Sequence, residues 1–222
     1  MSLAIFDLDN TLIADDSDYL WGQFLVEQGI VDSDVYADAN EKFYNDYKHG
    51  KLDIVEFLNF SLKPLADNDV EQLYRWRENF IAQKIQPILL PAAQQLIQHH
   101  RQKGDTLLII TATNRFITEP IADLYGIKHL IATTPEIKHG QFTGNFTGIP
   151  SFQEGKVQLL QQWLLDFPTE SLGDSWFYSD SHNDLPLLKR VKNPVAVDPD
   201  ATLRIYALEQ QWQILSLREA SA

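Results

Sequence analysis

The chain has 222 residues, of which 44% are hydrophobic and 22% are charged, a balance typical of globular proteins. Its formal net charge of −13 disfavours nucleic acid as a partner, and no basic stripe with interleaved aromatic residues offsets that charge. The absence of cysteine excludes disulfides and thiolate metal sites, and no apolar run is long enough to span a membrane. The start of the chain does not resemble a secretory signal, so we expect a cytoplasmic protein that binds neither nucleic acid nor membranes.

The first expected element is a short buried strand over residues 3–6, because a continuous apolar run suits a parallel strand covered on both faces. Asp7 and Asp9 follow it in the pattern Asp-x-Asp-x-Thr, which ends at Thr11. Side chains two apart on a strand share a face, so both carboxylates can act on one ligand. Two like charges this close favour a cation between them, and oxygen-only ligation favours Mg²⁺. The alternative is an acidic turn that caps the next helix.

Residues 15–86 have a helical character throughout. Apolar residues at helical spacing predict four helices, at about 19–26, 35–47, 52–64 and 70–81. Four helices without an intervening strand favour a small bundle. The acidic start of this segment, at Asp15, Asp16 and Asp18, has two interpretations: a helix N-terminus that favours negative charge, or recognition of an amine on a substrate.

From Pro91 onward, helices and strands alternate. We expect strands at 106–110, 129–132, 176–179 and 194–197, helices at 91–103, 114–125, 154–167, 184–190 and 200–213, and a hairpin that joins 134–137 to 142–146. This alternation predicts an α/β fold with a doubly wound parallel sheet. The domain organisation that follows is a core of residues 1–14 and 87–222 with an inserted helical domain of residues 15–86.

Polar residues follow three of the expected strands, where ligands bind in such sheets. They are Asp7 with Asp9, then Thr111, then Asp180. A hydroxyl at Thr111, beside small residues and a helix start, suits a phosphate oxygen. The alternative is a helix N-cap, which Thr113 or Asn114 could also provide.

Two further positions suggest charged partners. Lys156 lies early in an expected helix, where a cation opposes the helix dipole, so it either has a local anionic partner or is solvated. The loop from Asp180 to Asp184 adds two carboxylates and the Asn183 amide. Asn183 or Asp184 would suffice as a helix cap, which leaves Asp180 for a metal or a hydrogen bond, and we expect His182 to be a bystander.

The order of these residues resembles the haloacid dehalogenase superfamily of phosphohydrolases, over the whole chain. The matching motifs are Asp7-Leu-Asp9-Asn-Thr11, Thr111, Lys156 and Asp180-Ser-His-Asn183-Asp184. The helical insert is similar to the cap of that family. The resemblance is closest to the phosphoserine-phosphatase-like branch (subfamily IB), which includes bacterial histidinol-phosphatases. The segment 111–114, Thr-Ala-Thr-Asn, stands where phosphoserine phosphatases carry Ser-Gly-Gly, which argues against phosphoserine as the substrate.

The resemblance implies an enzyme that hydrolyses a small-molecule phosphomonoester with Mg²⁺ as cofactor. Asp7 would attack phosphorus and form an aspartyl-phosphate, and Asp9 would protonate the leaving alcohol and then activate water. Thr111 and Lys156 would bind the phosphoryl oxygens.

The resemblance also implies a metal site and a substrate site. Mg²⁺ would be held by Asp7, the Asp9 backbone carbonyl and Asp180, with Asn183 or Asp184 close by. The candidate substrate-binding residues are Asp16, Thr11, Ala112 and Asn114.

Histidinol phosphate is the expected substrate, and phosphoserine or another amino-alcohol phosphate is the alternative. The carboxylate of phosphoserine needs a cation, and Arg75 and Arg77 are two apart on a helix, so they point to different faces. A receiver module of the response-regulator type is an alternative of another class, although a helical insert of about 70 residues has no place in it. A non-catalytic binder of phosphate esters is a third.

Overall fold

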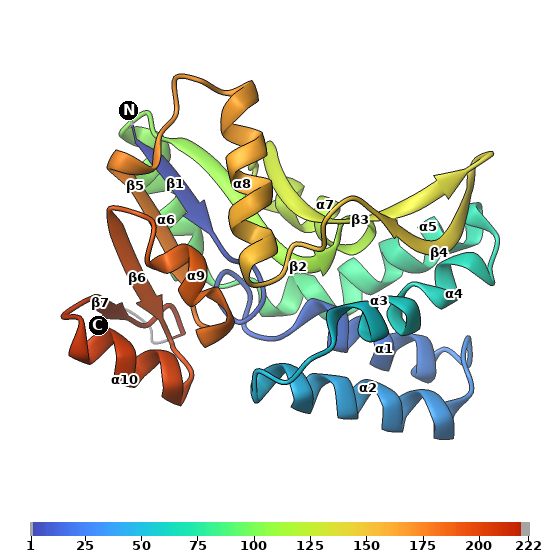
Figure 1. The fold of residues 1–222 in the computed structure, drawn as a ribbon. Coiled ribbons are helices and arrows are strands. Elements are labelled where there is room, and N and C mark those ends of the chain that lie inside the picture. The colour runs from blue at the N-terminus through green and yellow to red at the C-terminus, as the bar shows by residue number, and fades with distance from the viewer. Residues whose placement is uncertain (1, 219–222) are drawn as a thin grey trace.

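A seven-stranded sheet forms the centre of the protein, in a computed structural model that describes residues 2–218 (Figure 1). The strands are β1 (Leu3–Phe6), β2 (Thr106–Asn114), β3 (His129–Lys138), β4 (Gln141–Thr147), β5 (Ser175–Ser179), β6 (Asn193–Val197) and β7 (Gln213–Leu215). Their order is β4-β3-β2-β1-β5-β6-β7, and every neighbouring pair is parallel except β3 with β4. The predicted α/β fold with a mostly parallel sheet is confirmed.

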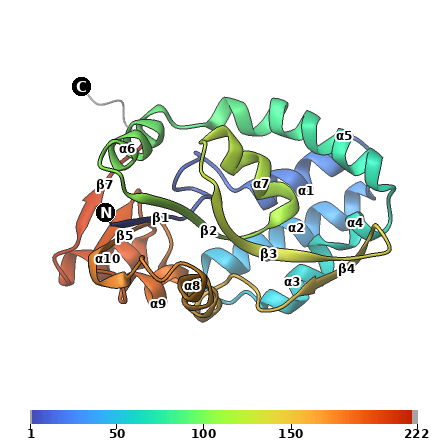
Figure 2. The same cartoon turned by 90° about the horizontal axis from the view of Figure 1, so that it is seen from above.

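Helices cover both faces of the sheet, as Figure 2 shows from above. They are α6 (Pro91–Gln102), α7 (Arg115–Leu124), α8 (Glu154–Asp166), α9 (Leu185–Leu188) and α10 (Ala201–Glu209). Side chains along β1 alternate between two apolar clusters, with Ala4 and Phe6 in one and Leu3 and Ile5 in the other. Helices α6 and α7 pack into the first cluster, and α8, α9 and α10 into the second. The apolar run at β1 is therefore explained by burial on both faces.

The segment between β1 and β2 is helical, as predicted. It contains α1 (Ser17–Glu27), α2 (Ser33–Lys48), α3 (Ile54–Ser61), α4 (Lys63–Ala66), α5 (Val70–Phe80), a π-helical turn (Ile81–Ile85) and a 3₁₀ turn (Gln86–Ile88). Helices α1, α2, α3 and α5 begin at aspartates whose carboxylates accept backbone N–H bonds, namely Asp16, Asp32, Asp53 and Asp69. Helix capping thus accounts for part of the acidic composition.

An aromatic cluster joins this helical segment to the sheet domain. The Trp21 ring on α1 packs edge-on against Phe80 of α5 and Phe116 of α7, with centroid distances of 5.2 and 6.0 Å. All three side chains are buried. The helices are therefore held against the same face of the sheet as α7, next to the carboxyl ends of β1 and β2.

The strands and helices differ from the sequence-based expectations at several boundaries. Strand β2 continues through Thr111 to Asn114, with an irregular register to β3 after Ile110. Strand β3 is one continuous strand whose second half pairs with β4, and the predicted hairpin turn is confirmed, with His139 and Gly140 at φ of 52° and 79°. These strands are longer than expected because pairing with neighbours extends them past the local apolar runs.

The C-terminal part also differs. The helix expected at 184–190 is a 3₁₀ turn (His182–Asp184) followed by the short helix α9. The helix expected at 200–213 ends at Glu209, because Gln211 adopts a φ of 57° and the chain then adds β7 beside β6. No helix within residues 2–218 combines the length and the apolar character that crossing a bilayer requires.

Candidate active site

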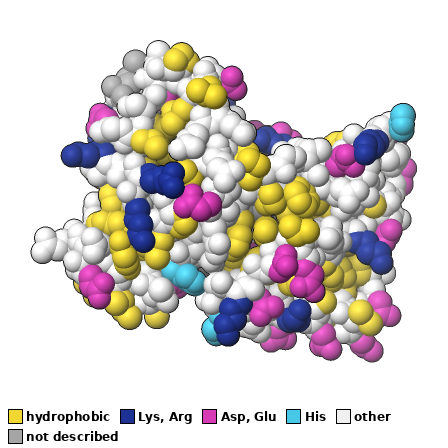
Figure 3. All heavy atoms as spheres, viewed as in Figure 1, with side chains coloured by type: hydrophobic (Ala, Val, Ile, Leu, Met, Phe, Trp, Pro, Cys, Tyr) yellow, Lys and Arg dark blue, Asp and Glu magenta, His cyan; other side chains and the backbone are white. Residues whose placement is uncertain are grey.

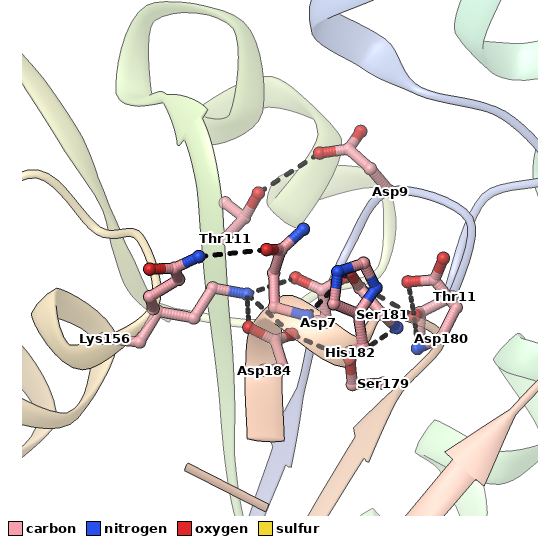
Figure 4. Close-up of polar contacts among 12 residues, drawn as sticks. Asp7, Asp9, Thr11, Thr111, Lys156, Ser179, Asp180, Ser181, His182 and Asp184 are labelled. Atoms are coloured by element: carbon pink, nitrogen blue, oxygen red, sulfur yellow. Dashed lines mark hydrogen bonds and ion pairs between the residues drawn. The ribbon is translucent and has the colours of Figure 1, made fainter. Parts of the chain in front are cut away.

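The predicted polar residues meet where β1, β2 and β5 end. Strand β1 pairs in parallel with both β2 and β5, and the Asp7 N–H donates to the Tyr178 carbonyl at 2.9 Å, which continues the ladder past the strand. This is the point where the strand order reverses, which is the usual ligand site of such sheets. Figure 4 shows Asp7, Lys156, Asp180 and Asp184 gathered there.

Lys156 forms a buried ion cluster with two carboxylates. Its Nζ lies 2.7 Å from Asp7 Oδ1 and 2.9 Å from Asp184 Oδ2, and the Ser179 hydroxyl donates to Asp184 Oδ2 at 2.7 Å. Burial lowers the pKa of Lys156, but the charges of Asp184 and Asp7 outweigh burial and raise it above its usual range. The lysine is 2% exposed, so the alternative of a solvated surface lysine is wrong.

Gly155, the residue before Lys156, has no room for a side chain, because a Cβ there would overlap the backbone carbonyl oxygen of Pro150. Backbone atoms cannot move aside as a flexible side chain can. We therefore expect Gly155→Ala to lower the free energy of unfolding by about 1–3 kcal/mol and to reduce activity by displacing Lys156. Urea denaturation and phosphate release measure the two effects. Gly173→Ala is the control, since a Cβ there has only an ordinary contact of 3.8 Å with Ser171; equal losses in both variants would contradict the argument.

Thr11 links the first motif to the last. Its hydroxyl lies 3.2 Å from Asp180 Oδ1 and 3.5 Å from Asp7 Oδ2, and it accepts the Asp180 N–H at 3.1 Å. Thr11 is fully buried and does not line the cavity described below. Its contacts are with the two carboxylates, and it orients them rather than contacting a ligand in the cavity.

The carboxylates carry a surplus of negative charge that fits a divalent cation. Burial, with repulsion from Asp184 and Asp9, raises the pKa of Asp7 to about 7 despite Lys156. Burial and repulsion from Asp7 and Asp184 also raise the pKa of Asp180. Three carboxylates against one ammonium, with oxygen donors only, suit Mg²⁺. Within residues 2–218 no three His, Cys, Asp or Glu side chains converge as a complete metal site, so backbone or water oxygens would have to complete the coordination.

Two predicted metal residues use their side chains elsewhere. Asn183 Oδ1 accepts from Gln153 Nε2 at 3.1 Å, and Asn183 Nδ2 donates to the Tyr47 carbonyl on α2 at 3.1 Å. Asp184 is held by Lys156 and Ser179. His182 pairs through Nδ1 with Asp200 Oδ2 at 2.7 Å and does not line the cavity with Asp7.

Asp9 points away from Lys156, towards Thr111 (Figure 4). Its Oδ1 accepts the Ser17 N–H at 2.7 Å, and its Oδ2 accepts the hydroxyls of Thr113 at 2.9 Å and Thr111 at 3.2 Å. Its side chain is therefore separate from the Lys156 cluster. Thr113 is not among the predicted partners of Asp9, although it lies two residues from Thr111 and residues two apart on a strand share a face.

Asn114 is a helix cap rather than a cavity residue. Its Oδ1 accepts the Ile117 N–H at 3.4 Å at the start of α7, and its side chain does not line the cavity. Of the predicted substrate-binding residues, Ala112 and Asp16 do line it. Asp16 also caps α1 by accepting the Tyr19 N–H at 2.8 Å, which confirms the helix-cap interpretation, while recognition of an amine stays a prediction.

A cavity that is partly open to solvent lies between the ends of the strands and the helical segment, and Asp7 is among the residues that line it. The core supplies Asp7, Asp9, Thr111, Ala112 and Thr113, and the helical segment supplies Asp16, Asp18, Tyr19, Asn40, Phe43, Tyr44, Tyr47, Leu52, Ile54 and Phe57. The residues from α2 and α3 were missed, because helical spacing alone does not tell which face meets a cavity. This lining, with aromatic and apolar side chains around a few carboxylates and hydroxyls, is typical of a small-molecule site.

Neither candidate arginine reaches the cavity. Arg75 pairs with Glu71 on the surface at 3.3 Å, and Arg77 donates to the Phe116 carbonyl at 2.9 Å. Among the described residues that line the cavity there is no arginine or lysine.

Comparison with known proteins decides the family. Residues 4–189 match the haloacid dehalogenase-like hydrolase family. The chain belongs to this family. A histidinol-phosphatase of Neisseria meningitidis is 47% identical over 220 residues, covering 98% of this chain and 99% of that protein. A phosphoserine phosphatase of Mycobacterium tuberculosis is 30% identical over 223 residues, covering 98% and 71%.

Solved structures share the fold of this chain. A Bordetella pertussis protein of unknown function superposes with a TM-score of 0.91 at 41% identity, covering 97% of this chain and 98% of that one. A phosphoserine phosphatase solved as a phospho-aspartyl intermediate analogue has a TM-score of 0.71 at 17% identity, covering 98% and 94%, and so shares the fold. As a haloacid dehalogenase-like hydrolase with phosphatase relatives, this chain is a phosphoric monoester hydrolase, which argues against a receiver module.

Proposed function

We propose that this chain is a Mg²⁺-dependent phosphatase that hydrolyses histidinol phosphate through an aspartyl-phosphate on Asp7. The observation that carries the proposal is the Asp7 carboxylate, which lines the cavity and is held at Oδ1 by the Lys156 ammonium. The 47% identity to a histidinol-phosphatase supports the choice of substrate.

The residues supply a two-step route. Asp7 attacks phosphorus, so an Asp7–phosphorus bond forms as the ester bond breaks. Asp9 donates its proton to the departing alkoxide and then takes a proton from water, which attacks the phosphoryl group and frees Asp7. Lys156 and Thr111, which flank these two carboxylates, hold the phosphoryl oxygens.

Mg²⁺, when bound, would draw negative charge from the phosphoryl oxygens. The residues that would hold it are Asp7, Asp180 and the backbone carbonyl of Asp9, with Asn183 or Asp184 nearby. Thr11 fits this arrangement because its hydroxyl already bridges Asp7 and Asp180.

The cavity favours an amine-bearing leaving group over phosphoserine. Histidinol phosphate carries an ammonium and an imidazole, which suit a lining with Asp16 and aromatic rings. The carboxylate of phosphoserine would find no arginine or lysine among the described lining residues.

We also propose a division of labour between domains. Residues 15–86 form a cap over a core of residues 1–14 and 87–222, and the cap excludes water from the reacting groups. This proposal is supported by the lining of the cavity, to which α1, α2 and α3 contribute residues together with the ends of β1 and β2. The Asn183–Tyr47 hydrogen bond joins the two parts directly.

Removal of divalent metal tests the proposed cofactor. Dialysis against a chelator should lower phosphate release from histidinol phosphate at least about a hundredfold, because the surplus carboxylates would then repel the substrate. Added Mg²⁺ should restore it, and phosphate release measured with a molybdate dye follows both steps. Full activity in a metal-free preparation would contradict the cofactor, and faster hydrolysis of phosphoserine than of histidinol phosphate would contradict the substrate.

A further inference from the structure

Asp18 is a buried carboxylate that lines the cavity and has no role in the proposed reaction. It lies in the first turn of α1, is 8% exposed, and lines the cavity with Asp7 and Asp9. Across residues 2–218 no hydrogen bond or ion pair reaches its side chain, whereas Asp16 accepts the Tyr19 N–H. Burial of an ionised group without a partner is costly. This carboxylate is therefore placed for a partner that the chain itself does not provide.

The surroundings of Asp18 favour a cation. Burial and the Asp9 charge raise the pKa of Asp18 to about 7, so a bound cation would stabilise its ionised form. Aromatic residues at positions 43, 44 and 57 line the same cavity, and aromatic faces attract organic cations. The described lining has no basic residue that could pair with Asp18 in place of a ligand.

We infer that Asp18 binds a protonated nitrogen of the leaving group and thereby selects cationic phosphomonoesters. The inference rests on the proposed function, which it deepens by assigning the recognition of charge to Asp18 more than to Asp16. The carboxylate of Asp16 is already committed to the cap of α1, and the carboxylate of Asp18 is not.

The structural alternative is that Asp18 only stabilises the start of α1. Helices α2, α3 and α5 also carry an acid in the first turn, at Asp34, Glu56 and Glu71, but these are exposed. Stabilising a helix N-terminus does not require burial. Figure 3 shows charges of both signs interspersed where α2 lies, as expected of such solvated acids, and Asp18 differs from them in facing a cavity.

The test is steady-state kinetics of Asp18→Asn with esters that differ in charge. The panel is histidinol phosphate, an analogue that keeps the imidazole but lacks the amine, phenylalaninol phosphate, which keeps the amine but lacks the imidazole, and p-nitrophenyl phosphate. Asp18→Asn should raise KM for histidinol phosphate roughly ten- to a hundredfold and leave p-nitrophenyl phosphate nearly unchanged. If the substitution raises KM for phenylalaninol phosphate, Asp18 binds the amine. If it raises KM for the analogue without the amine, Asp18 binds the imidazole.

Two variants control for the fold. Asp34→Asn removes a first-turn acid from an exposed position and should leave KM unchanged for both histidinol phosphate and p-nitrophenyl phosphate. Asp18→Ser removes the charge with a smaller side chain and should repeat the Asp18→Asn pattern. Thermal denaturation reports whether each variant is folded.

The outcomes separate the inference from the proposed function. Equal loss on histidinol phosphate and p-nitrophenyl phosphate, or no loss on either, would overturn the role of Asp18 while the wild-type preference for histidinol phosphate stands. If the wild type instead prefers another cationic ester and Asp18→Asn removes that preference, the inference holds and the assigned substrate is wrong. A wild type with no preference for cationic esters would overturn both.

Discussion

Asp7→Asn should reduce kcat by at least about 10⁴-fold, because an amide cannot act as the nucleophile that forms the phospho-enzyme. Asn has nearly the same shape as Asp, and its side-chain oxygen can still accept from Lys156, so the fold should persist. Phosphate release gives the rate. Mass spectrometry of acid-quenched protein should find a phosphoryl group on the wild type and none on the variant.

Asp9→Asn distinguishes the proposed role of Asp9 from that of Asp7. Loss of general acid–base catalysis is typically worth about 10²–10⁴-fold, so turnover should fall, yet Asp7 can still accept phosphate from an ester with a good leaving group. The amide should remain in place because Ser17, Thr111 and Thr113 surround the carboxylate now. The phospho-enzyme should therefore accumulate with p-nitrophenyl phosphate. A trapped phosphoryl group on any residue other than Asp7 would refute the assignment.

Lys156→Met should lower the free energy of unfolding by about 3–5 kcal/mol, the usual cost of removing one partner from a buried ion pair. The Asp7 and Asp184 carboxylates would lose their common counter-ion at 2.7 and 2.9 Å. Activity should fall as well, because the same ammonium is proposed to hold the phosphoryl group. Urea denaturation measures the loss of stability, and Lys128→Met, at an exposed position, is the matched control.

The Lys156→Met deficit should depend on pH. The pKa of Asp7 is already raised from 3.8 to about 7 by burial and neighbouring charge, and loss of Lys156 raises it further. Below about pH 7 both folded proteins hold the Asp7 proton, so their stabilities fall in parallel as pH rises from 4 and the deficit stays constant. Above pH 7 the wild type releases this proton and the variant keeps it, so only the variant continues to lose stability and the deficit should grow. A deficit that does not increase between pH 7 and pH 9 would show that packing, not charge, accounts for it.

The core motifs could be predicted because their determinants are local. Each of Asp7, Thr111 and Asp180 comes at or near the end of an apolar run, and the carboxyl ends of parallel strands meet at one edge whatever the loops do. The boundaries of β2, β3 and the C-terminal helix were less predictable. The ends of a strand depend on pairing with strands that are distant in sequence. Strand β7, for example, forms by pairing with the edge of β6.

The sequence by itself determined the alternation of strands and helices, the helical insert, and the candidate site residues that follow the strands, since hydrophobic period and motif spacing are properties of the chain alone. Only the tertiary structure decided which helical side chains face the cavity. A helix presents side chains in every direction, and the way α2 packs determines that Asn40 and Phe43 line the cavity. The same packing gave Lys156 its two carboxylate partners, committed Asp16 to a helix cap and left Asp18 buried without a partner.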